Sequence, residues 1–113
     1  MKLITKEIAL ALERGAEVDT DEGPIPVVVK FFDPCVSWTW FATAGQRVGP
    51  GEHDWICFGL VQGFESALGS FSLAELAKVR GPLGLGIERD LHFSGAIDVS
   101  SWPPQIVSER RSS

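Results

Sequence analysis

Three side chains that could carry acid–base chemistry alternate near the end of the chain. Glu88, Asp90 and His92 occupy every second position of the segment from Ile87 to Phe93, which we expect to be a strand, so they share one face of it. Two carboxylates and an imidazole are the groups that general acid–base catalysis or metal binding requires. The same alternation is also typical of the solvent-facing side of an edge strand, which is the interpretation we favour.

Arg89 lies on the opposite face of this strand, together with Ile87, so its guanidinium is expected to be partly buried and to need a carboxylate or carbonyl partner. The Gly-rich connector from Gly81 to Gly86 is short and brings the preceding helix close to the strand. We therefore expect a polar cluster that either locks helix to sheet or recognises a ligand or partner. Its members are Arg80, Glu88, Arg89 and Asp90.

Trp38 and Trp40 project to one side of a second expected strand, from Ser37 to Thr43. The chain has 4 Trp and 7 Phe, which is many for its size, and most of these rings should lie in the core. A core ridge is therefore the first interpretation of the Trp pair. The alternative is a partly exposed aromatic anchor for another protein, because protein interfaces favour Trp.

No catalytic residue, metal site or cofactor is expected. Cys35, His53, Cys57 and His92 lack the short CxxC spacing of structural zinc sites. Cys57 lies within an apolar strand, where a free Cys acts as a small hydrophobic residue. The connector from Gly81 to Gly86 lacks the Lys-Ser/Thr of a phosphate-binding P-loop, and a strand rather than a helix follows it.

Composition indicates an ordinary globular chain of 113 residues, with 44% hydrophobic and 22% charged residues. The net charge of −5 disfavours direct binding to nucleic acid. The two cysteines, the charged start and the lack of a long apolar run predict a cytoplasmic protein with reduced thiols and no membrane association.

The fold class expected from these patterns is α+β, with three to four antiparallel strands and two short helices packed on one face. Thr5 caps a helix that runs to about Arg14, and Ser72 with Glu75 forms a capping box for a second helix that ends near Val79 or Arg80. The expected strands span residues 27–32, 37–43, 55–62 and 87–93, and residues 44–54 form a loop. Residues 1–98 make a single domain and residues 99–113 a loose C-terminal tail.

The run from Phe71 to Leu91 resembles the signature of the domain of unknown function 2958 family. The resemblance rests on Phe71-Ser72-Leu73, Glu75-Leu76, Val79-Arg80-Gly81-Pro82-Leu83-Gly84-Leu85 and Ile87-Glu88-Arg89-Asp90-Leu91, with further agreement before residue 62. The sequence departs from the family at Gly86, where proline is expected, at His92, where an aromatic is expected, and in a longer loop from Ala44 to His53. The family supplies no catalytic residues. The resemblance implies a small bacterial protein encoded on plasmids or other mobile genetic elements.

The function expected from these observations is that of a non-enzymatic accessory protein that binds another protein, such as a host-defence or conjugation component. A small hydrolase-like enzyme that uses Glu88, Arg89 and Asp90 is one alternative. An acidic inhibitor that mimics nucleic acid is another, and it requires carboxylates such as those of Asp19 and Asp21 to form a continuous stripe. The sequence is also compatible with a homodimer.

Overall fold

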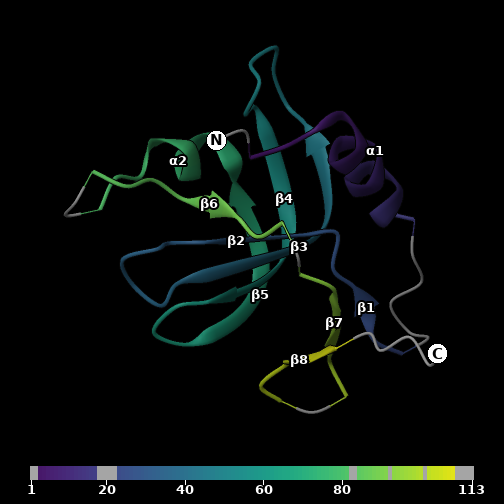
Figure 1. The fold of residues 1–113 in the computed structure, drawn as a ribbon. Helices are drawn as coiled ribbons and strands as arrows, with labels where there is room; N and C mark the ends of the chain where they lie inside the picture. The colour runs from purple at the N-terminus through teal and green to yellow at the C-terminus, as the bar shows by residue number, and fades with distance from the viewer. Residues whose placement is uncertain (1–2, 18–22, 82–83, 92, 101, 109–113) are drawn as a thin grey trace.

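The computed structural model describes residues 3–17, 23–81, 84–91, 93–100 and 102–108, which form two antiparallel sheets and two short helices (Figure 1). In chain order the elements are α1 (Lys6–Gly15), β1 (Ile25–Pro26), β2 (Val29–Phe32), β3 (Thr39–Arg47), β4 (Trp55–Gln62), β5 (Ser66–Ser72), α2 (Leu73–Lys78), β6 (Glu88–Arg89), β7 (Gly95–Asp98) and β8 (Gln105–Ser108).

The large sheet has the strand order β5-β4-β3-β2-β6, with β3 and β4 at its centre. The expected strand from Trp55 to Gln62 coincides with β4. The strands expected at residues 27–32 and 37–43 are confirmed in part as β2 and β3, which pair antiparallel. β3 extends to Arg47, into the segment predicted to be a loop, and it stays paired with β4 on both sides of an irregularity between Ala42 and Ala44.

The small sheet has the order β1-β7-β8 and lies at the lower right of Figure 1. The chain changes sheets directly after β1, because the Val27 amide donates to the Gly95 carbonyl at 2.9 Å and the Val28 amide to the Ala42 carbonyl at 2.8 Å. It changes back after β6, which pairs with β2 in the large sheet, whereas β7 pairs with β1.

The expected α+β fold with three to four strands is wrong, because the described residues contain eight strands in two antiparallel sheets. β1 has two residues, which is too short to show any alternation, and the strand expected from Ile87 to Phe93 is confined to the two residues of β6. The sequence predicts a linker from Phe64 to Phe71, with at most a short strand near Ser70 and Phe71, yet residues 66–72 pair with β4 along their whole length. The predicted loose tail contains β8, which pairs with β7, and Pro104 beside it is buried.

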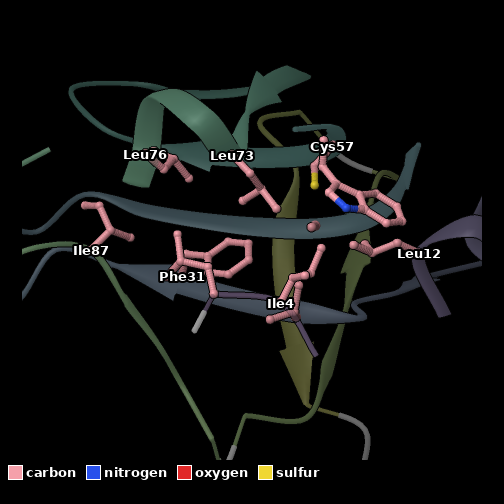
Figure 2. Packing of buried hydrophobic residues seen from close by; sticks show 11 residues of the cluster. Ile4, Leu12, Phe31, Cys57, Leu73, Leu76 and Ile87 are labelled. Atoms are coloured by element: carbon pink, nitrogen blue, oxygen red, sulfur yellow. The ribbon is translucent and has the colours of Figure 1, made fainter. Parts of the chain in front are cut away.

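Two hydrophobic cores lie on opposite faces of the large sheet. Trp40 and Ala42 pack in the main core, whereas Phe41 between them packs in the second core, as alternation along a strand requires. The buried residues of the main core are Leu3, Ile4, Leu12, Val29, Phe31, Ala42, Trp55, Cys57, Leu73, Leu76 and Ile87. Figure 2 shows this core with Leu76 and Ile87 at one end and Leu12 and Cys57 at the other.

The second core lies between the two sheets, where Phe41 and Leu60 of the large sheet meet Ile25 and Ile97 of the small one. The partly buried Ile106 of β8 packs against this core. The small sheet therefore covers one face of the large sheet, and the two helices pack on the opposite face.

Both helices begin where the sequence predicts. The Thr5 hydroxyl accepts from the Ile8 amide at 3.2 Å at the start of α1, and the Ser72 hydroxyl accepts from the Glu75 amide at 3.2 Å at the start of α2. Side-chain oxygens at these positions satisfy amides that have no partner within the helix. Ser72 is also the last residue of β5, so this cap fixes the direction in which α2 leaves the sheet.

Candidate functional site

Two turns meet at one end of the large sheet. Thr39 of β3 pairs with Gln62 of β4, so the residue before β3 lies beside the residue after β4. The turn before β3 closes through a hydrogen bond from the Asp33 amide to the Trp38 carbonyl at 3.1 Å. The ring of Trp38 lies against Gly63, at the start of the turn that leads into β5.

Three aromatic rings, of Trp38, Trp40 and Phe64, form a continuous aromatic cluster over these turns. The centroids of Trp38 and Trp40 are 6.0 Å apart with the rings tilted by 35°. Phe64 meets Trp38 edge-on, with centroids 5.5 Å apart and an interplanar angle of 84°. These are favourable geometries for aromatic pairs.

Exposure increases along the aromatic cluster. Trp40 is half-buried and packs against the main core, whereas Phe64 at the other end is 94% exposed. Trp40 faces the core, as the first interpretation of the Trp pair predicts, whereas Trp38 connects it to an exposed phenyl ring. Phe64 was missed in the sequence analysis, although an apolar ring between Gly63 and Glu65 in a turn is a signal that could have indicated it.

Arg80 lies just beyond the end of α2, and its side chain binds carbonyl groups there. Its guanidinium Nη1 donates to the carbonyls of Ala77 at 3.0 Å and Val79 at 2.7 Å. The last carbonyls of a helix have no partner within the helix, so a cation there satisfies them and interacts well with the helix dipole. An isolated bridge pairs Arg80 with Gly86, which confirms that the connector is tight.

A cavity of about 330 Å³ lies between the end of α2 and β6. It is lined by Leu3, His53, Ala77, Arg80, Gly86, Ile87 and Glu88. The His53 Nε2 is buried without a hydrogen-bond partner among the described residues and lies 3.7 Å from the Glu52 carboxylate. Within the same residues no ion pair joins Arg80 to Glu88.

Arg89 and Asp90 line a different cavity, of about 270 Å³, beside α1 and β2. The Lys30 ammonium lies 3.5 Å from the Asp90 carboxylate and 5.3 Å from the ring centroid of Phe93. The expected polar cluster is therefore divided: Arg80 and Glu88 face one cavity, and Arg89 and Asp90 face the other. Alternation along β6 separates Glu88 from Arg89, whereas Asp90 lies beyond the end of this strand and does not continue the alternation that was expected to place it with Glu88.

The two described thiols have different surroundings. Cys57 is fully buried in the main core, and burial raises the pKa of its thiol to about 12. Cys35 is half-buried in the turn after β2, with its amide donating to the Asp33 carboxylate at 2.8 Å. Among the described residues no group of three or more His, Cys, Asp and Glu side chains could hold a metal ion. His92, Asp19 and Asp21 lie outside the described residues.

Comparison with protein families gives a match over residues 3–109 to the model described as "Protein of unknown function (DUF2958)". The chain belongs to the DUF2958 family. No curated protein and no solved structure gave a significant match.

In this DUF2958 protein the described residues that resemble the family signature lie in consecutive elements of the fold. They cover the end of β5, the capped helix α2, the bridge between Arg80 and Gly86, and β6. Leu73, Leu76 and Ile87 from this part of the chain are buried in the main core, so part of the signature stabilises the fold. No helix in the described part of the chain is long and apolar enough to cross a membrane.

Proposed function

We propose that this DUF2958 protein is an accessory protein of a mobile genetic element and acts in the cytoplasm by binding another protein through the aromatic cluster. The observation that carries the proposal is the 94% exposure of Phe64, whose ring is nevertheless held edge-on against Trp38. A ring that is both exposed and positioned is available to a partner without rearrangement.

Energetics support an interface here. Covering a phenyl ring removes apolar surface from water and contributes roughly 1.5–3 kcal/mol. Trp38 is seated over Gly63, where a Cβ would overlap the indole ring, so it loses little side-chain freedom when a partner binds. Tryptophan in a preorganised position is typical of the residues that dominate binding energy.

The aromatic cluster also indicates the kind of partner. A protein with an apolar pocket for the Phe64 ring is required, and with a net charge of −5 on this chain a neutral or basic rim around that pocket is favoured. A host-defence or conjugation component fits the expected genetic setting. The hydrolase alternative has less support, because Glu88 faces a different cavity from Arg89 and Asp90.

The test compares Phe64→Ser with Val48→Ser, a matched control in another loop whose side chain is 55% exposed. The tagged unmutated protein is expressed in the bacterial host, and the partner that it retains is purified. Titration calorimetry then measures the dissociation constant of this partner for the unmutated protein and for each variant. We expect Phe64→Ser to weaken binding at least about tenfold, which corresponds to about 1.4 kcal/mol. Val48→Ser should bind like the unmutated protein.

Thermal melts of both variants provide the folding control, because an exposed ring contributes little to stability. Equal affinities of Phe64→Ser and the unmutated protein for the purified partner would exclude the aromatic cluster as the binding surface.

A further inference from the structure

The two edges of the large sheet differ in how well they are protected. β6 forms one edge with two residues only, Glu88 and Arg89, and both are charged. β5 forms the other edge with seven residues, Ser66–Ser72, and contains neither a charged residue nor a proline. Short length, charge and proline are the usual means by which proteins prevent edge strands from pairing, and β5 has none of them.

The outer backbone groups of β5 are available for pairing. Within the described residues β5 pairs with β4 alone, so the amides and carbonyls on its other side have no strand partner. An extended strand is the structure that satisfies such a row of alternating donors and acceptors. The sequence of β5 indicates which strand this is.

β5 is complementary to itself when it pairs antiparallel about Gly69. Gly69 then lies opposite Gly69 of a second copy, Leu68 opposite Ser70, and Ala67 opposite Phe71. Each large side chain meets a small one, and no charged side chain meets another. Antiparallel pairing of a strand with its own copy has two-fold symmetry, which closes the assembly at two chains.

The charge of the chain and the position of its exposed apolar residues both favour β5 as the contact between two copies. Two chains that each carry a net charge of −5 repel one another, and an uncharged strand is where they can approach. Phe58 pairs with Ser70, shares its face of the sheet and is 45% exposed, and Ile56 is 37% exposed. Leu68 of a second copy would extend this apolar row on the same face.

We propose that the protein forms a homodimer in which the β5 strands of two copies pair antiparallel about Gly69, so that the two large sheets become one continuous sheet. The proposal is independent of the aromatic cluster, and Phe64→Ser should leave the dimer intact.

Sedimentation equilibrium of the full chain tests the dimer. We compare the unmutated protein with Gly69→Asp, because a Cβ at Gly69 meets no atom within 4 Å and the substitution therefore fits the folded monomer. Across the two-fold axis the new carboxylates lie directly opposite one another, which is destabilising. We expect the dissociation constant to rise at least about tenfold, whereas Ser37→Asp, which adds the same charge at an exposed turn, should change it little.

Symmetric crosslinking tests the register. In a Cys35→Ser background, mild oxidation should link Gly69→Cys chains into a covalent dimer, because the two thiols face each other across the axis. Ala67→Cys is the control, since it faces Phe71 rather than itself. A monomer up to about 100 μM, equal dimerisation of Gly69→Asp and Ser37→Asp, or equal crosslinking at both positions would overturn the proposal. If the protein is monomeric, a strand of a different protein would remain as the occupant of the β5 edge.

Discussion

At the residue scale, a glycine decides where the aromatic cluster lies. A Cβ on Gly63 would overlap the six-membered ring of Trp38, so only glycine lets the indole lie flat across the turn. Trp38 in turn supports the edge of Phe64. The exposed ring therefore depends on a position that carries no side chain itself.

Cysteine reactivity gives a residue-scale prediction. Burial raises the pKa of the Cys57 thiol to about 12, so at pH 8 it stays protonated and does not act as a nucleophile. Cys35 is half-buried and lies in a turn, so reagent can reach it. We expect a disulfide reagent at pH 8 to modify one thiol per folded chain, and two after addition of denaturant.

Cys35→Ser provides the control, because this variant should show no reactive thiol until it unfolds. Rapid modification of the folded Cys35→Ser protein would mean that Cys57 is accessible and that the packing around it is looser than described.

Sequence reasoning succeeds for residues whose environment is set by their own strand. Cys57 was expected to behave as a small hydrophobic residue because it lies within an apolar strand, and its burial confirms this. Phe64 was missed because its exposure is set by its own turn and by Trp38, which lies in a different turn, directly before β3. Proximity between distant segments is what a single sequence does not reveal.

At the scale of elements, the start of α2 carries a prediction. Ser72→Ala removes the hydroxyl that accepts from the Glu75 amide, and we expect the free energy of unfolding to fall by about 1 kcal/mol. Ser37→Ala is the matched control, because Ser37 is exposed in a turn. Urea denaturation measures both variants. A midpoint for Ser72→Ala equal to that of Ser37→Ala would show that the cap contributes nothing.

Elements with strong local signals were predicted at close to their full length, whereas β1 was missed and the strand that contains β6 was predicted too long. The capped helices and β4 have cap residues or a long apolar pattern within their own sequence. β1 and β6 are extended because they pair with longer strands, as Arg89 of β6 pairs with Phe31 of β2. The short connector predicts that Arg80 and Glu88 lie close together. Alternation along the strand predicts that Glu88 and Arg89 lie on opposite sides of β6.

At the scale of the whole molecule, the second core joins the two sheets and gives a further prediction. Ile106 of β8 packs against this core, whereas the neighbouring Val107 is 37% exposed. Ile106→Ala should lower the free energy of unfolding by about 1–2 kcal/mol, because apolar atoms leave a partly buried site. Val107→Ala on the same strand should change it by less than about 0.5 kcal/mol. Equal effects in thermal or urea unfolding would show that β8 does not seal the core.

The small sheet has a consequence for synthesis of the chain. Its strands come from both ends of the sequence, since Ile25 pairs with Ile97 and β8 follows only at Gln105. A ribosome delivers residues in order, so β1 emerges long before the strands that pair with it. Until the last strand is released, Phe41 and Leu60 lack their cover, and the nascent chain presents an apolar sheet face to chaperones. Synthesis of β7 and β8, rather than formation of the large sheet, is then the event that completes the second core.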